Sequence, residues 1–482
     1  MFDDFGLMKG AVRTMKKSVS ILLIAILMMA ALLAGCSGSP AEEPPASSGQ
    51  AATDDPSSAP AAVEGKEPEP KGGPVKTTEV AYDGEPVTLK FIIAVDDETF
   101  RIRFKDQIEA TFPNITLELA EASLDAAGLQ ELNARGDIPD LYVMHSGYQD
   151  MKELDMLEPL DPYIERSGFD MSIFREGVVD VIRALDPDGA GALYGMPIED
   201  SRKALFYNKV IFDKFGVDYP KDGMTYDEIL DLAQKLTTER DGVKYKGFSF
   251  GYYSHAFSQL GVNGTDPQTG EVLFAKEPAF QQFFELLDKY RNIPGMIDTS
   301  DYTYSFSNEQ NVAMYIGQLQ HLPLNNAVEG LDFDIVSVPE WPDHKGIGPT
   351  APAVSVSINK HSRHKEAAWA VIAYLASEAG QMVLSRAGSP PTINSEEAVS
   401  EYAAMHIEES GKTYNIAPIF EQKPAPIAVY SPYGPLITFN YDDFINLKAK
   451  DFVKMPGKDT ATFLREMEEE YAGLVKEMKV KK

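Results

Sequence analysis

The chain has 482 residues, of which 74 are acidic and 44 basic, so its formal net charge is -30. This surplus of negative charge argues against a nucleic-acid partner, because binding to phosphates depends on basic patches. It also disfavours adsorption to an anionic bilayer surface. About 400 residues follow residue 84, which is too many for one compact core and indicates two domains.

A basic pair, Lys16 and Lys17, precedes an uncharged apolar run over residues 18–34. A basic stretch, an apolar run and then small residues are typical of a secretory signal peptide, here residues 1–35. The alternative is a permanent anchor helix, because the run is close to the roughly 17 residues that can span a bilayer. Asp3 and Asp4 are unusual ahead of a basic pair, so Met15 and Met1 both remain candidate start sites.

The apolar run closes on Leu33-Ala34-Gly35-Cys36, which resembles the lipobox of bacterial lipoproteins. The resemblance implies cleavage before Cys36 and a lipid on its sulfur, the most nucleophilic side-chain atom available for alkylation. Cys36 is the chain's single cysteine, so no disulfide competes for it. We therefore expect a protein anchored by its lipid on the extracellular face of the cell membrane, in a Gram-positive bacterium.

Residues 36–84 are rich in Pro, Gly, Ser and Glu and contain almost no large apolar side chains. Such a segment cannot bury enough surface to offset the entropy of ordering it. We expect a disordered tether between the lipid and a folded body, rather than an N-terminal domain of its own.

The folded body begins with alternating strand and helix signals. Apolar, β-branched runs predict strands over 87–95, 115–119 and 139–145, and helices are expected over 97–111 and 126–135. This alternation indicates an α/β layer built on a parallel sheet. A Thr225/Glu228 capping-box pattern marks the start of another amphipathic helix. Further helices are expected over 280–290, 364–377 and 460–478.

Four later segments occur in an order that resembles a known family. They are Tyr194-Gly-Met-Pro with a strand ending Tyr207-Asn-Lys, the strand 311–317, the strand, turn and helix of 354–369, and Met455-Pro-Gly. Together they resemble extracellular solute-binding proteins of the maltose-binding type, which are the capture subunits of ABC importers. The resemblance covers about residues 87–482.

The resemblance implies a two-lobed α/β fold of the periplasmic-binding-protein type II. Each lobe would be a mixed sheet flanked by helices, with a hinge between the lobes and the ligand in the cleft. The first lobe would comprise residues 85–199 and 354–393, and the second residues 200–353 and 394–482. Hinge motion would close the lobes on a small solute.

Candidate ligand-binding residues follow from the strand ends, where open α/β sheets bind their ligands. Asp96 and Asp97 follow the first strand, although Asp97 could instead cap the next helix. His145 and Ser146 end the third strand. Asp200 and Arg202 lie at the first crossing, where Arg202 could bind ligand or pair with a neighbouring carboxylate.

Aromatic faces suit sugar C–H surfaces or cations, which makes Tyr252, Tyr253 and the loop residue Trp341 candidates. Tyr441 is a candidate because the resemblance places a late cleft aromatic in its region. Gln318 offers an amide just after the strand 311–317. There the chain reads Gln-Leu-Gln, where sugar-binding relatives often have Pro-Trp, so a stacked oligosaccharide is not the only ligand to consider.

No phosphate loop or Gly-x-Ser-x-Gly motif occurs, and we expect no catalytic residues and no cofactor. His361 and His364 could form half of a metal site, but they also fit the turn before a helix, so no metal is expected. The sequence therefore predicts a monomeric solute-binding lipoprotein that serves ABC permease subunits, with a sugar or oligosaccharide as ligand. Polyamines remain an alternative ligand, and a surface glycoside hydrolase or a ligand sensor an alternative function.

Overall fold

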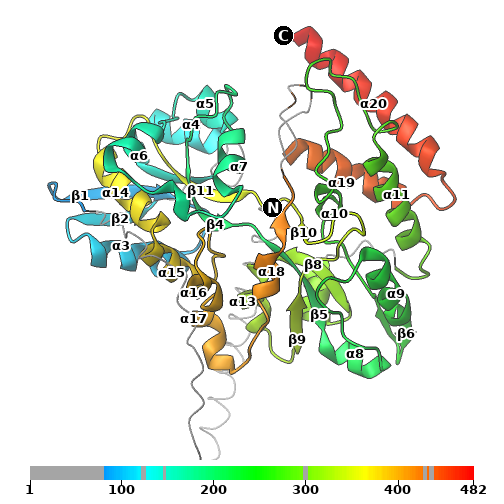
Figure 1. Ribbon diagram of the computed structural model, residues 1–482. Coiled ribbons are helices and arrows are strands. Elements are labelled where there is room, and N and C mark those ends of the chain that lie inside the picture. The colour runs from blue at the N-terminus through cyan, green and yellow to red at the C-terminus, as the bar shows by residue number, and fades with distance from the viewer. Residues whose placement is uncertain are drawn as a thin grey trace, which may run out of the picture. The chain divides into compact units, whose positions relative to one another are not determined.

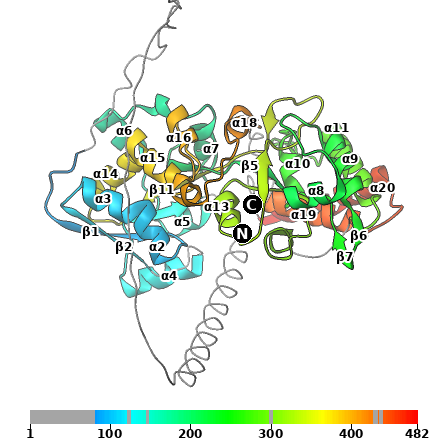
Figure 2. The same ribbon diagram turned by 90° about the horizontal axis from the view of Figure 1, so that it is seen from below.

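The computed structural model describes residues 81–120, 126–144, 148–296, 302–426, 431, 433 and 439–481. The predicted signal peptide, Cys36 and most of the predicted tether lie outside these residues. Within the described part, two separate sheets each form the centre of a helix-covered lobe (Figures 1 and 2).

The first lobe contains a five-stranded sheet in the order β2-β1-β3-β11-β4. β1 (Val87–Ile92) pairs in parallel with β2 (Ile115–Leu119) and β3 (Leu141–Met144). β11 (Ala353–Ile358) returns from far along the chain and runs antiparallel between β3 and β4 (Met196–Asp200). The sheet is therefore mixed, as the resemblance implies.

Alternate residues of β3 point to opposite faces of the sheet, and each face carries its own apolar core. Leu141 and Val143 join one buried apolar cluster and Tyr142 and Met144 join the other. The first cluster includes residues of α2 (Asp97–Phe100), η1 (Arg101–Lys105), α3 (Asp106–Thr111), α6 (Asp161–Ser167), α14 (Lys365–Ala376) and α15 (Glu378–Arg386). The second includes residues of α4 (Ala126–Arg135), α5 (Gln149–Glu153) and α7 (Val178–Ala184).

The second lobe is built on the antiparallel sheet β8-β5-β9. β5 (Lys203–Asn208) lies between β8 (Met314–Gln318) and β9 (Phe333–Val336). The segment around Ser249 adds parallel bridges to β8 and its approach, which makes this sheet mixed as well. Leu205 and Tyr207 face one core, and Ala204 and Phe206 face the other.

The helices of the second lobe come from two parts of the chain. The part before β11 supplies α8 (Lys209–Phe215), α9 (Tyr226–Leu236), α10 (Ser254–Ser258), α11 (Pro278–Arg291), α12 (Tyr302–Tyr304), η3 (Ser305–Glu309) and α13 (His321–Asn326). The part after the first lobe supplies α18 (Ala417–Glu421), α19 (Phe439–Val453) and α20 (Thr460–Lys481), seen in orange and red in Figure 1. α16 (Glu396–Ser400) and α17 (Ala404–Ile407) pack on α15 and on helices of the second lobe.

Local sequence signals explain several boundaries. Thr225 and Glu228 form the expected capping box at the start of α9. Asp96, and not Asp97, is the N-cap of α2, because its carboxylate accepts a hydrogen bond from the backbone N–H of Thr99.

Gly195 is required by close packing, since a Cβ there would lie 2.3 Å from the hydroxyl of Tyr148 and 2.4 Å from that of Ser355.

Two short pairs complete the described strands: β6 (Thr238–Arg240) with β7 (Val243–Tyr245), and β10 (Ile347–Gly348) with β12 (Lys423–Pro424). Among the described residues, no single helix is long and apolar enough to cross a membrane. α14 and α15 reach that length only together, and they are bent by 66°.

Candidate functional site at the joint between the lobes

The chain passes from one lobe to the other between β4, which ends at Asp200, and β5, which begins at Lys203. Asp200 is fully buried, and its Oδ2 accepts a hydrogen bond from Nε of Arg202 at 2.8 Å. Nη1 of Arg202 also donates to the carbonyl oxygens of Ile419 and Gln422, at 3.2 and 2.5 Å. The predicted site residues Asp200 and Arg202 are thus an internal ion pair that also fastens the end of α18.

Glu199 forms a second buried contact at the joint. Its carboxylate pairs with Arg103 of the first lobe and accepts a hydrogen bond from Nε2 of Gln320, in the second lobe, at 2.7 Å. The side chain of Glu199 is 8% exposed and that of Arg103 is 17% exposed. One buried carboxylate therefore joins groups from both lobes.

Beside this carboxylate, polar groups of the second lobe come together. Lys203 and Gln318 are opposed across β5 and β8, and Nζ of Lys203 donates to the carbonyl of Thr350 at 3.1 Å. Burial of His255 lowers the pKa of its imidazole to about 3, and the nearby charge of Lys203 acts in the same direction. His321 is also close enough to lower that pKa, so these side chains from β5, β8, α10 and α13 share one region.

The two adjacent tyrosines play different parts, as adjacent residues at the edge of a core often do. Tyr253 packs on Phe250 and Tyr290, with ring centroids 5.4 and 6.1 Å apart, and burial raises the pKa of its hydroxyl to about 12. Tyr252 instead meets His255 edge-to-face at 5.4 Å. Tyr252, and not Tyr253, is therefore the tyrosine that lies beside the polar side chains at the joint.

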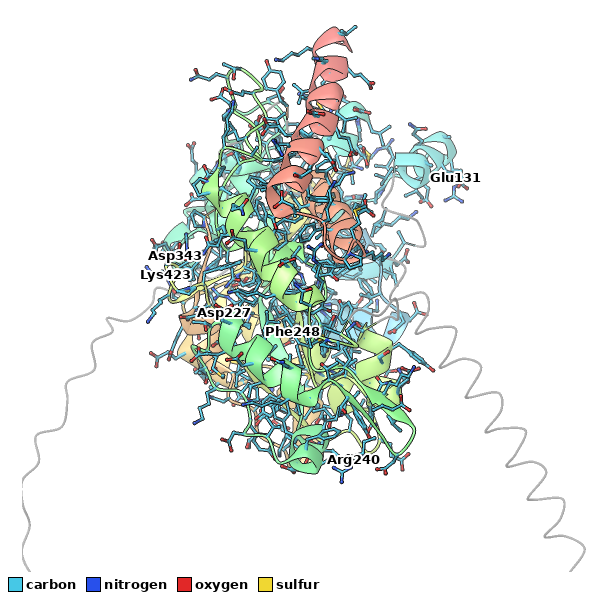
Figure 3. The ribbon with its side chains drawn as sticks, turned by 90° about the vertical axis from the view of Figure 1, so that its right-hand side faces the viewer. Glu131, Asp227, Arg240, Phe248, Asp343 and Lys423 are labelled. Carbon is cyan, nitrogen blue, oxygen red and sulfur yellow. The ribbon has the colours of Figure 1, made fainter. Side chains whose placement is uncertain are left out.

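Trp341 is not the accessible loop aromatic that its sequence context suggests. It is 4% exposed, its ring packs on Tyr226 at 5.1 Å, and its Nε1 donates to the carbonyl of Ala256 at 2.9 Å. It borders a small surface hollow between α9 and α11, which is also lined by Asp227, labelled in Figure 3. Pro339 and Pro342 flank Trp341 and are typical of a loop, but the indole fills the core of the second lobe.

The remaining predicted site residues are placed as follows. Asp96 uses its carboxylate to cap α2, and Asp97 is an exposed residue in the first turn of that helix. His145 and Ser146 lie outside the described residues. Tyr441 lies in α19, and only the backbone of this residue is described.

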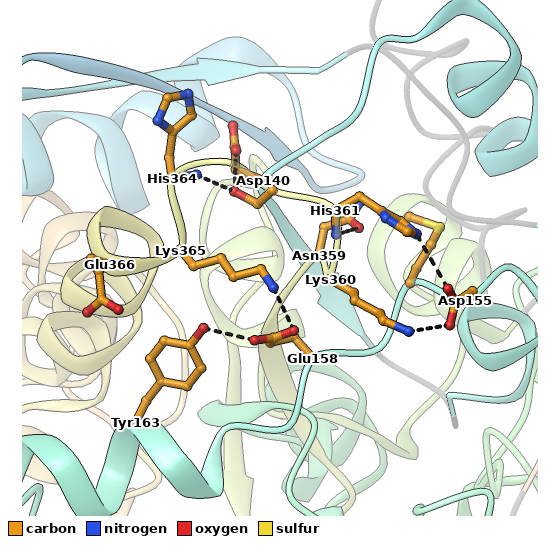
Figure 4. Close-up of polar contacts among 12 residues, drawn as sticks. Asp140, Asp155, Glu158, Tyr163, Asn359, Lys360, His361, His364, Lys365 and Glu366 are labelled. Atoms are coloured by element: carbon orange, nitrogen blue, oxygen red, sulfur yellow. Dashed lines mark hydrogen bonds and ion pairs between the residues drawn. The ribbon is translucent and has the colours of Figure 1, made fainter.

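The two histidines considered for a metal belong to the turn after β11 (Figure 4). Nε2 of His361 lies 3.8 Å from Asp155, while the backbone N–H of His364 donates to Oγ of Ser362 at 3.0 Å. Ser362 in turn donates to Asp140 at 2.5 Å. These bonds hold the turn in place, and no group of three or more His, Cys, Asp or Glu side chains suited to a metal occurs in the described part of the chain.

Sequence patterns had not drawn attention to Arg103, Lys203, His255 or His321. Arg103 and His255 lie within helices and carry no motif, and their place at the joint follows only from the packing of distant segments. Lys203 had a signal, because it directly follows Arg202 and opens the strand that pairs with the strand 314–318.

The comparisons with known proteins agree with this architecture. Residues 94–382, more than half of the chain, match the family model for bacterial extracellular solute-binding proteins. A Brucella abortus protein named as a binding protein, BAB2_0491, is 25% identical over 320 residues, which cover 62% of this chain and 73% of the relative.

Solved structures show the same fold at low identity. The substrate-binding protein Lmo0181 of Listeria monocytogenes, solved with cycloalternan, has a TM-score of 0.60 and 19% identity, covering 81% of this chain and 99% of its own. UgpB of Mycobacterium tuberculosis, solved with glycerophosphocholine, has a TM-score of 0.61 and 16% identity, covering 82% and 99%. The sugar-binding protein MalE of Xanthomonas citri has a TM-score of 0.60 and 19% identity, covering 81% and 98%. By its family match, this chain is a bacterial extracellular solute-binding protein with the two-lobed fold of the ABC-importer capture subunits.

Proposed function

We propose that the protein captures a small solute between its lobes and delivers it to the permease subunits of an ABC importer. The observation that carries this proposal is the meeting of polar side chains from both lobes at the joint, where Arg103 and Gln320 converge on Glu199. A ligand held at such a joint touches both lobes, so it favours the closed arrangement over the open one. The proposed lobes are residues 85–199 with 354–393 and residues 200–353 with 394–482.

A neutral, hydroxyl-rich ligand fits this joint better than a polyamine. A polyamine would be held by carboxylates, but Glu199 and Asp200 each pair with an arginine, which neutralises their charge, and Asp96 caps a helix. Imidazole, amide and phenol groups also lie at the joint, and such groups exchange hydrogen bonds with hydroxyl groups. We therefore propose a sugar or oligosaccharide, in keeping with the sugars bound by several proteins of similar fold.

The proposed contacts lie on both sides of the joint. Tyr252 would lie against the apolar face of a sugar ring, and Gln318 would bind its hydroxyls. Asp97, His145, Ser146 and Tyr441 stay in the proposal as contacts from the rims of the two lobes. Asp200 and Arg202 would act by fixing the joint.

The anchor belongs to the same proposal. A lipid on Cys36 and a tether over residues 36–84 would keep the binding body at the membrane, near the permease. A flexible tether of about 45 residues has a root-mean-square length of roughly 35–40 Å. Cys36→Ser should then release an intact, ligand-competent protein into the medium. A variant that stays in the membrane fraction would show that residues 18–34 are an uncleaved anchor helix.

A thermal-shift screen tests the proposed ligand class. The probes are maltotriose, cellotriose, raffinose and tagatose, with spermidine and glycerophosphocholine as charged comparisons. A ligand at 100 times its dissociation constant stabilises the folded protein by about 2.7 kcal/mol, which a melting curve resolves. We expect a shift with at least one saccharide and none with spermidine. A shift with spermidine alone would contradict the assignment of a neutral ligand.

A further inference from the structure

A second contact between the lobes lies on the Asp200 side of the joint. Arg175, just before α7 in the first lobe, lies with its guanidinium carbon 4.8 Å from the ring centroid of Phe420 in α18. Phe420 belongs to the same buried cluster as Phe206 in the second sheet. Next to it, Glu176 of the first lobe pairs with Lys423 at 3.2 Å. Residues 175 and 176 thus meet residues 420 and 423 across the lobes.

This contact leaves two complementary polar atoms without partners. Oδ2 of Asp200 is bound by Arg202, but Oδ1 is buried and has no hydrogen-bond partner among the described residues. Nε of Arg175 is likewise buried and without a partner. A buried carboxylate oxygen and a buried guanidinium N–H are each unfavourable when unpaired, and they are natural partners for each other.

The charges of Arg175 and Asp200 already interact. Arg202 lies over the same Phe420 ring as Arg175, at 5.2 Å, and Arg202 is the residue that binds Asp200. Burial and the charge of Arg202 lower the pKa of Arg175 to about 10, and the charge of Asp200 acts in the opposite direction. The ring of Phe420 and the side chain of Arg202 thus link Arg175 with Asp200.

We propose that Arg175 is a latch that leaves the face of Phe420 and binds Oδ1 of Asp200 when the lobes close. This inference rests on the proposed function, because it presupposes closure around a ligand. Asp200 ends β4 and pairs with Ala353 of β11, so Asp200 and Arg175 both belong to the first lobe, whereas Phe420 is carried by the second lobe and moves off Arg175 as the lobes rotate. Arg175 is then a positioning residue: it favours the closed form, and so raises ligand affinity, without touching the ligand.

The test uses the full chain carrying Cys36→Ser, with spin labels on cysteines introduced at Glu131 and Val210, one exposed position in each lobe. The distance between the labels is measured as maltotriose, raffinose or tagatose is added. Arg175→Met keeps an apolar stem over Phe420 and removes the guanidinium. Glu176→Gln, in the exposed pair beside it, is the matched control.

In the protein that retains Arg175, we expect the distance between the labels to change to a second value when a saccharide is added. Arg175→Met should need a saccharide concentration at least tenfold higher for the same change. Glu176→Gln should close at the unaltered concentration. Asp200→Asn also weakens the pair with Arg202, so it has an effect of its own, but adding Arg175→Met to Asp200→Asn should change saccharide affinity by no more than about twofold, because the latch interaction is already lost. In the ligand-free protein the two side chains are not paired. The effects of Arg175→Met and Asp200→Asn on the free energy of unfolding in urea should therefore be additive.

Two results would overturn the latch while leaving solute binding intact. One is closure of Arg175→Met at the same saccharide concentration as the protein with Arg175. The other is strong coupling between Arg175→Met and Asp200→Asn in the ligand-free protein, which would mean that the pair is permanent. If the protein with Arg175 neither binds nor closes with any of the three saccharides, the proposed function fails and the latch fails with it.

Discussion

Gln320 Nε2 donates to Glu199 Oε1 at 2.7 Å, and this bond ties the turn after β8 to β4, an edge strand of the first lobe's sheet. Because Arg103 pairs with the other oxygen of the same carboxylate, Glu199 is satisfied from both lobes at once. The bond also places Gln320 at the joint.

Glu199→Ala should lower the free energy of unfolding by about 2–4 kcal/mol, because Arg103 would be left as a largely buried cation without its partner. Urea denaturation followed by circular dichroism measures this change. Glu366→Gln is the control, since Glu366 forms an exposed pair with Arg166 and should cost under about 1 kcal/mol. Equal stability losses for the two variants would contradict a special role for Glu199.

Trp341→Ala should act on stability rather than on ligand binding. Removing a buried indole costs about 3–5 kcal/mol, and the carbonyl of Ala256 loses its hydrogen bond. Urea unfolding should show this loss, while titration of the folded variant with its saccharide should give an affinity within about threefold of the unaltered protein. A large loss of affinity in a fully folded variant would instead place Trp341 in the binding site.

Tyr252 and Tyr253 form a matched pair of adjacent residues. Tyr252→Ala should weaken saccharide binding about tenfold, the loss expected for one aromatic contact of about 1.4 kcal/mol, with little change in unfolding. Tyr253→Ala should mainly lower stability, because its ring packs on Phe250 and Tyr290. Calorimetric titration and urea unfolding of both variants separate the two effects, and the reverse pattern would exchange the assignments.

His255 should make stability depend on pH. Burial lowers its pKa to about 3, compared with 6.5 in an unfolded chain. Between these values the unfolded chain binds more protons than the folded protein, so the free energy of unfolding falls as the pH is lowered from about 6.5 towards 3. The loss from pH 7 to pH 5 should be smaller in His255→Gln, by up to about 2 kcal/mol. Identical pH profiles for the two proteins would show that His255 is not held neutral by burial.

The sequence predicted local structure well where the signal was local. The helix over 126–135 has the bounds of α4, and the Thr225/Glu228 pattern marks the start of α9. The apolar segment predicted as a helix over 364–377 forms α14, whose Trp369 packs on Tyr163 at 5.7 Å. Such features depend on periodicity and capping within a few residues of chain.

The joint was harder to predict because it depends on distant segments. Arg103, Glu199 and Gln320 are 96 and 121 residues apart, counted from Glu199. No local pattern distinguishes such an arginine from one on a solvated helix face. The burial of Trp341 was not predicted for a related reason. The flanking prolines indicate only the local backbone, whereas the burial depends on contacts with Tyr226 and with α10.

The most direct test of the account is calorimetric titration of the full chain carrying Cys36→Ser with the saccharides of the thermal-shift screen, followed by chromatographic recovery of the sugar. We predict one saccharide bound per chain and the same saccharide recovered unchanged. Conversion of the sugar into products, or a folded protein that binds no member of the panel, would contradict capture of a saccharide for transport.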